Sequence, residues 1–88
     1  MWEGWDKYVD RENCKRYELL VGSKIEVLLV VYLDKVAPES SAWKALVIAF
    51  NPGAGEYIDY EVVFPNFVEA ETKAWEAAQE AVIIRRDL

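Results

Sequence analysis

The chain has 88 residues, of which 53% are hydrophobic and 14% aromatic, a composition that excludes an intrinsically disordered protein. Sixteen acidic residues against ten basic ones give a formal net charge of −6, which excludes the basic surface by which proteins ordinarily bind nucleic acids or anionic membranes. The longest apolar run is far shorter than the roughly 20 residues of a membrane-spanning helix, and the N-terminus lacks the apolar core of a signal peptide. We therefore expect one domain, residues 1–88, in the cytoplasm.

The N-terminal segment, residues 2–12, carries large side chains at Trp2, Trp5, Tyr8 and Val9. These spacings place the four side chains on one side of a short amphipathic helix. A strand is the alternative, although it divides the polar and apolar residues less cleanly. In either form the segment offers much aromatic surface, and we expect it to cover one end or the second face of the sheet described next.

Four segments have the composition of β-strands: 15–21, 25–33, 42–50 and 57–64. Residues 25–33, with the sequence IEVLLVVYL, are predicted to form the central strand. Side chains alternate between the two faces of a strand, and here one side is wholly apolar and the other is apolar in its middle. We expect Gly22-Ser23 to form a two-residue hairpin turn into this strand. Later turns are expected at 38–41 and 51–55, which are rich in residues that favour turns.

The last predicted strand, residues 57–64, shows the clearest division between its two sides. Its expected inward side chains are Ile58, Tyr60, Val62 and Phe64, and its expected outward ones include Tyr57, Asp59 and Glu61. Charged side chains directed outward are one way in which an edge strand avoids further pairing. This segment is therefore predicted to lie at the edge of the sheet.

A C-terminal helix is predicted from Phe67 onward. Asn66 is a plausible N-cap, with Glu69 three residues later as its acidic partner. One face of the helix is rich in alanine, which permits close approach to a sheet; its members are Phe67, Ala70, Ala74, Ala77, Ala78, Ala81 and Ile84. The expected fold is α+β: a four-stranded antiparallel meander with this amphipathic helix packed on one face and a short N-terminal aromatic helix or segment.

The expected order of helix, strands and alanine-rich helix resembles a double-stranded RNA-binding domain. Members of that family grip phosphates with a lysine cluster at the start of the last helix. The matching residues here, 69–73, have the sequence EAETK and supply a single lysine. No direct binding to nucleic acid is therefore expected.

The residues that carry most enzyme chemistry are missing from this sequence. It contains no histidine, which excludes Ser-His and Cys-His nucleophile pairs and histidine metal sites. Cys14 is interpreted as an ordinary reduced cysteine, and Gly53-Ala54-Gly55 as a turn rather than a phosphate-binding loop. We expect no catalysis, no cofactor and no metal; an enzyme would need carboxylates and tyrosines such as Asp59 and Tyr57 to converge in a pocket.

Two sets of residues are candidates for binding another protein. The first is an acidic surface suited to a basic partner, comprising Glu56, Tyr57, Asp59 and Glu61 together with Glu26 and Asp34. Alternate residues on a strand stand roughly 6.6 Å apart on one face, so such a row could imitate nucleic-acid phosphates. The second is an apolar set on the second side of the central strands, suited to a homodimer: Leu28, Val30, Tyr32, Leu46, Ile48 and Phe50.

The leading hypothesis is a small acidic, non-catalytic domain that binds another protein. It would act as an inhibitor if it occupied a basic, nucleic-acid-binding surface of that partner, as small acidic inhibitors from phages and mobile elements do. The alternative is a homodimeric structural or regulatory module without mimicry of nucleic acid. If the N-terminal segment does not cover the second face of the sheet, that face needs another chain.

Overall fold

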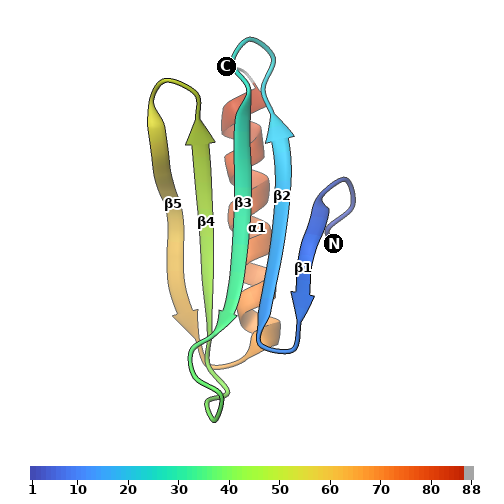
Figure 1. Ribbon diagram of the computed structural model, residues 1–88, viewed down its shortest axis with the longest axis vertical. Helices are drawn as coiled ribbons and strands as arrows, with labels where there is room; N and C mark the ends of the chain where they lie inside the picture. Colours follow the sequence, from blue (N-terminus) through green and yellow to red (C-terminus); the bar gives the residue numbers. More distant parts are fainter. Residues whose placement is uncertain (87–88) are drawn as a thin grey trace.

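The computed structural model describes residues 1–86 as one antiparallel sheet lying in front of a single long helix (Figure 1). The elements are β1 (Asp6–Arg11), β2 (Cys14–Val21), β3 (Val27–Lys35), β4 (Trp43–Asn51), β5 (Gly55–Phe64) and α1 (Phe67–Arg86). The strands lie side by side in chain order, and each pairs antiparallel with the next. The predicted α+β class, antiparallel meander and C-terminal helix are confirmed, but the prediction of four strands is wrong because there are five.

The additional strand is β1, so the preferred helix over residues 2–12 is wrong, and the alternative of a strand is found at Asp6–Arg11. Arg11 pairs with Cys14 across a two-residue turn, and β1 gains backbone hydrogen bonds along the edge of β2 that a short isolated helix could not match. The register shifts between Lys7 and Val9, which makes Tyr8 the extra residue of a β-bulge. This bulge breaks the alternation that identifies a strand. The first element of the described residues is thus a strand, where the resemblance to the double-stranded RNA-binding domain implied a helix.

β3 occupies the centre of the sheet, as predicted, but begins two residues later than the predicted strand. The last pair between β2 and β3 is Val21 with Val27, so five residues form the connection in place of the expected Gly22-Ser23 turn. Gly22 adopts a φ of 126°, and a Cβ added there would lie 1.9 Å from the carbonyl oxygen of Ile25. Only glycine fits at this point, where the chain crosses close to itself.

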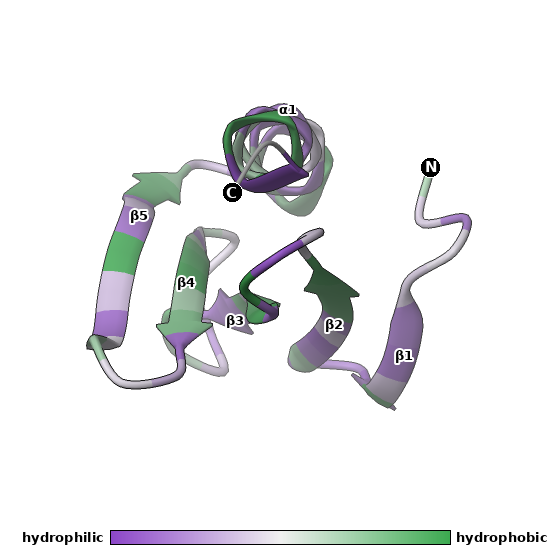
Figure 2. Cartoon of the chain, turned by 90° about the horizontal axis from the view of Figure 1, so that it is seen from above, coloured by the Kyte–Doolittle hydropathy of each residue, from purple (hydrophilic) through white to green (hydrophobic). Residues whose placement is uncertain are grey.

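α1 packs on one side of the sheet, mainly over β3, β4 and β5. Figure 2 shows the helix above one face, with the N-terminal residues curling up on the same side. Ala70, Ala74 and Ala78 are completely buried against Leu29, Val31 and other apolar side chains of the strands. Small side chains on the helix let it approach the sheet closely, while the larger strand residues fill the space between the two layers.

The start of α1 confirms the predicted cap. The backbone N–H of Glu69 donates to Oδ1 of Asn66 at 2.9 Å, which satisfies one of the free N–H groups in the first helical turn. The predicted helix face is correct for its alanines and wrong for Ile84, which is 59% exposed. Val82 is buried near this end of the helix instead.

The N-terminal aromatic residues lie on the side of the sheet that carries α1, so the expectation that they cover the second face is wrong. The ring of Trp2 stacks on Tyr17 with centroids 4.2 Å apart and meets Trp75 of α1 edge-on at 5.2 Å. Its indole N–H donates to Glu71 at 3.2 Å. The segment therefore extends the existing core beside the helix and leaves the opposite face of the sheet without it.

Candidate protein-binding face

The side of the sheet opposite α1, called here the open face, is organised as four rows of side chains running across β2, β3, β4 and β5. Residues directly opposite one another in an antiparallel sheet point to the same side, so the register defines each row. The rows are Leu20, Leu28, Phe50 and Glu56; Glu18, Val30, Ile48 and Ile58; Arg16, Tyr32, Leu46 and Glu61; and Cys14, Asp34, Lys44 and Val63.

The apolar set that the sequence analysis singled out lies together on the open face. Leu28, Val30, Tyr32, Leu46, Ile48 and Phe50 form the middle two positions of the first three rows. Among residues 1–86, no helix lies over them, because α1 is on the far side of the sheet (Figure 1). Val30 and Ile48 are nonetheless 3% and 5% exposed, whereas the other four are half-buried. Neighbouring side chains of the sheet, rather than a second layer, shield the two in the middle.

A β-bulge in β5 rearranges the predicted acidic row. Val47 faces Tyr60 and the adjacent Ile48 faces Ile58, so Asp59 is an extra residue in β5. Ile58 consequently lies on the open face and is 59% exposed, which contradicts its predicted inward position. Asp59 turns toward the helix, where its carboxylate forms an ion pair with Arg85 at 2.8 Å.

The bulge also divides the predicted binding residues between the two sides of the sheet. Tyr57 pairs with Ala49 and lies on the helix side together with Asp59. The remaining four acids, Glu26, Asp34, Glu56 and Glu61, lie on the open face or line its end. The regular row of outward acids expected on this strand is therefore interrupted at Asp59.

Both basic side chains in the four rows are already neutralised. Arg16 forms an ion pair with Asp34, and its guanidinium group lies over the ring of Tyr32, 4.3 Å from the centroid. Partial burial opposes the positive charge of Arg16, but the hydrogen bond and negative charge of Asp34 outweigh it and raise the pKa of Arg16. Lys44 forms an ion pair with Glu61 at 2.6 Å. The charges at this end of the open face therefore cancel.

The acids toward the other end have no such partners. Within residues 1–86, Glu18, Glu26 and Glu56 take part in no ion pair. Asp6 of β1 lies directly opposite Glu18 and is likewise outside every ion pair of the described chain. Two like charges opposite each other in a sheet are unfavourable. The free charge of this face is thus negative, and it is concentrated around the end that carries Leu20, Leu28 and Phe50.

Two members of this acidic group, Asp6 and Glu18, were not identified by the sequence analysis. Glu18 alternates with Arg16 and Leu20 in a strand that was predicted correctly, so the period of two could have placed it on this face. Asp6 could be placed only once residues 6–11 were known to form a strand.

Tyr8 borders the open face on the β1 side. Burial raises the pKa of Tyr8, and neighbouring Tyr32 and Glu18 raise it further because they disfavour the phenolate. The side chain is still 46% exposed. With Leu20, Ile58 and Val63, which are each more than half exposed, it forms an apolar border around the central residues.

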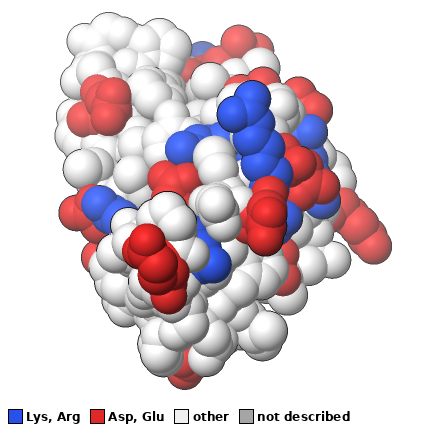
Figure 3. Space-filling view, turned by 60° about the horizontal axis from the view of Figure 1, so that its bottom comes forward, with Lys and Arg blue, Asp and Glu red and all other residues white. Residues whose placement is uncertain are grey.

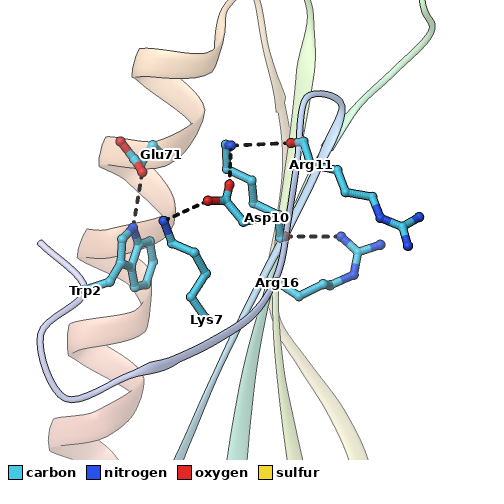
Figure 4. A network of polar contacts seen from close by, with 7 residues as sticks. Trp2, Lys7, Asp10, Arg11, Arg16 and Glu71 are labelled. Carbon is cyan, nitrogen blue, oxygen red and sulfur yellow. Dashed lines mark hydrogen bonds and ion pairs between the residues drawn. The ribbon is translucent and has the colours of Figure 1, made fainter.

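The helix side of the sheet near the β1–β2 turn, at the opposite end from the free acids, is held by polar contacts instead (Figure 4). Asp10 accepts hydrogen bonds from Lys15 at 2.8 Å and Lys7 at 3.4 Å, and these bonds lower the pKa of its carboxyl group. Trp2 and Glu71 meet in the same region. Figure 3 shows basic and acidic side chains next to one another on this end of the molecule. Because these charges are paired locally, this region offers less free charge than the open face.

The single cysteine and the glycine-rich turn lie in different parts of the sheet. No group of three or more acidic or cysteine side chains in residues 1–86 is arranged to hold a metal ion. Cys14 is half-buried in the fourth row of the open face, and Gly53 and Gly55 lie at the turn between β4 and β5. The prediction of a turn at Gly53-Ala54-Gly55 is confirmed, because these residues connect the paired strands β4 and β5.

The hydropathy of α1 is too low for it to cross a membrane, and it is the one helix in residues 1–86. Comparison with known proteins found no family model, no curated protein and no solved structure that matches this chain. The proposals that follow are therefore based on the geometry and charge of the open face.

Proposed function

We propose that this protein is a non-catalytic interaction domain that binds a basic, amphipathic surface of another protein through the open face. One observation carries the proposal: the apolar centre of the sheet is covered by α1 on one side only, while the other side presents apolar residues bordered by unpaired acids. Contiguous apolar patches with a polar border are typical of protein interaction sites.

The size of the face is sufficient for a specific complex. The molecule measures 44 × 23 × 18 Å, and the sheet lies in the plane of the two longer axes (Figure 1). This outline encloses on the order of 1,000 Å², compared with about 800 Å² per partner in a standard interface. The side of the molecule that carries the open face is therefore comparable in size with one partner's share of a standard interface.

The charges of the face favour a basic partner over a second copy of this chain. Arg16 and Lys44 are held by Asp34 and Glu61, so the four rows of a second copy would bring unpaired acids and no unpaired base. A partner that carries lysine or arginine around an apolar centre would complement both features of the face. If the partner uses that basic surface to hold nucleic acid, binding of this domain would block it and inhibit the partner.

Affinity capture with paired variants tests the proposal. The bait is the whole chain, either unchanged or carrying Tyr32→Gln and Leu46→Gln in the centre of the open face. A matched control carries Val68→Gln and Ile83→Gln, which replace two exposed apolar residues on α1. We expect the unchanged and control baits to retain the same basic protein from the source lysate, and the open-face variant to lose it.

Salt and mass measurements complete the test. Because the acidic border contributes to binding, the captured complex should weaken between about 50 and 500 mM salt, where screening becomes strong. Light scattering of the purified chain should give a mass near 10.2 kDa. A dimer of twice that mass that is lost in the open-face variant would support the homodimer instead. Retention of every partner by the open-face variant would reject the proposal.

A further inference from the structure

The open face ends in a hollow between the β2–β3 and β4–β5 connections. Its volume is about 460 Å³, and it is open to solvent. Leu20, Leu28 and Phe50 line it as members of the first row, and Pro52 of the β4–β5 turn adds a further apolar wall. This volume falls within the roughly 300 to 1,000 Å³ of ordinary ligand pockets, so the hollow has room for a large side chain and its neighbours.

The hollow combines apolar walls with negative charge. Among residues 1–86, Glu26 and Glu56 are the two charged residues that line it, and none of the basic ones does. Glu56 lies directly across from Phe50, which in turn lies across from Leu28, so this carboxylate is placed at one side of an apolar floor. Neither carboxylate has an ion-pair or hydrogen-bond partner within residues 1–86. An anion would be repelled here, and a purely apolar occupant would leave both acids uncompensated next to it.

We propose that this hollow binds an arginine side chain of the partner protein. The aliphatic stem and the flat face of the guanidinium group would pack on Leu28 and Phe50, and the N–H groups would donate to Glu26 and Glu56. Arginine suits such a place because its guanidinium group is planar, weakly hydrated and able to bond two carboxylates at once. It also stacks favourably on aromatic rings. The inference rests on the proposed function, since the hollow is one end of the same face.

A small probe tests the hollow without requiring the partner. Hexylguanidinium carries an apolar stem and a guanidinium group, whereas hexanol has a similar stem and no charge. We expect hexylguanidinium, titrated into the ¹⁵N-labelled whole chain, to shift the amide resonances of residues 20, 26–28, 50–51 and 53–56, with a dissociation constant of about 1 mM. Hexanol should bind at least about tenfold more weakly, because a site that offers charged acceptors discriminates against a ligand without donors.

Matched variants identify the contribution of the two acids. The double variant Glu26→Gln, Glu56→Gln should weaken hexylguanidinium at least about tenfold, since charge-assisted bonds are roughly twice as strong as neutral ones. The control variant Glu12→Gln, Glu39→Gln makes the same change in net charge in the turns at the opposite end of the sheet. It should bind the probe like the unchanged chain. The inference is overturned by equal binding of hexanol and hexylguanidinium, by no effect of the hollow variant, or by absence of shifts around the hollow.

Failure of this inference and failure of the proposed function give different results. The central variant Tyr32→Gln, Leu46→Gln changes no residue that lines the hollow, so it should lose the captured partner and still bind hexylguanidinium. If the hollow does not bind the probe but the central variant still loses the partner, the interaction domain stands and the arginine site does not. If hexylguanidinium binds but the central variant retains the partner, the hollow is supported as a guanidinium site and the proposed protein-binding face is rejected.

Discussion

The two faces of the sheet use the same central strands but are completed in different ways. On the helix side, Leu29 and Val31 are completely buried beneath the alanines of α1. On the open face, the alternate residues Leu28 and Tyr32 remain half-buried, because no helix of the described chain packs on them. A strand with two apolar sides therefore does not by itself specify two covering layers. The layer that is missing is where we place the partner.

Truncating one leucine on each face tests this difference in packing most directly. Leu29→Ala should reduce the free energy of unfolding by about 2 to 5 kcal/mol, because it opens a cavity in the packed layer between β3 and α1. The neighbouring Leu28→Ala should cost about 1 kcal/mol or less, since this side chain is still partly in water. Urea unfolding followed by tryptophan fluorescence measures both. Equal losses would show that the open face is packed as tightly as the core.

A substitution on the helix tests how closely α1 approaches the sheet. Ala74→Leu inserts three additional carbons at a completely buried position and should destabilise the protein by about 1 to 3 kcal/mol. Val68→Leu, at an exposed position of the same helix, should change stability by less than about 0.5 kcal/mol. The same unfolding measurement compares the two. A neutral or stabilising Ala74→Leu would mean that the layer has unfilled space.

The N-terminal residues pack on the helix side of the sheet alone, so substitution of Trp2 tests how much they stabilise that side. Trp2→Ala removes the stacking on Tyr17 and the hydrogen bond to Glu71, and should cost about 1 to 3 kcal/mol. Trp2→Phe retains an aromatic ring and should cost less. Amide hydrogen exchange of β1 should accelerate in Trp2→Ala, while that of β4 changes little. Unchanged stability and exchange would indicate that this segment does not anchor β1.

The smallest expected effect is a dependence of stability on alkaline pH. Burial raises the pKa of Tyr17, and the negative charge of Glu71 raises it further, so the folded state favours the neutral phenol. A raised folded pKa contributes stability that is present below the unfolded pKa near 10 and is lost as the pH rises through the higher folded value. Tyr17→Phe should therefore lose less stability than the unchanged chain between about pH 9 and 11. Urea unfolding at several pH values measures this loss. Equal losses of unfolding free energy in the two proteins over this pH range would contradict the raised pKa of Tyr17.

Much of the architecture was predictable because its signals are local. The alternation in residues 25–33, the breaker-rich turn at 51–55 and the pairing of Asn66 with Glu69 each depend on neighbouring residues, and each is found nearly where expected. The six apolar residues of the open face were also grouped correctly, since a period of two within two paired strands fixes which side chains share a side.

The errors arise where one residue interrupts the period or where distant contacts decide. The bulge at Tyr8 interrupts the alternation of side chains in β1, so the strand was not recognised from the sequence. The bulge at Asp59 places Ile58 on the open face, opposite to its predicted side. Trp2 lies on the helix side because Tyr17 and Trp75 offer it a stacking and an edge-on contact there, and neither partner is near it in the sequence. The hollow combines Glu26 and Glu56 from two different hairpins, so it could not be found before the register was known.

The position of α1 after all five strands has a consequence for synthesis of the protein. Each strand pairs with the one made just before it, so the sheet can assemble stepwise as the chain leaves the ribosome. Until α1 has been synthesised, however, the apolar side chains on both faces of β3 and β4 are exposed to solvent, and exposed apolar surfaces are prone to aggregate. A nascent chain halted near the β5–α1 junction should therefore depend on chaperones, and the finished protein should depend on them less.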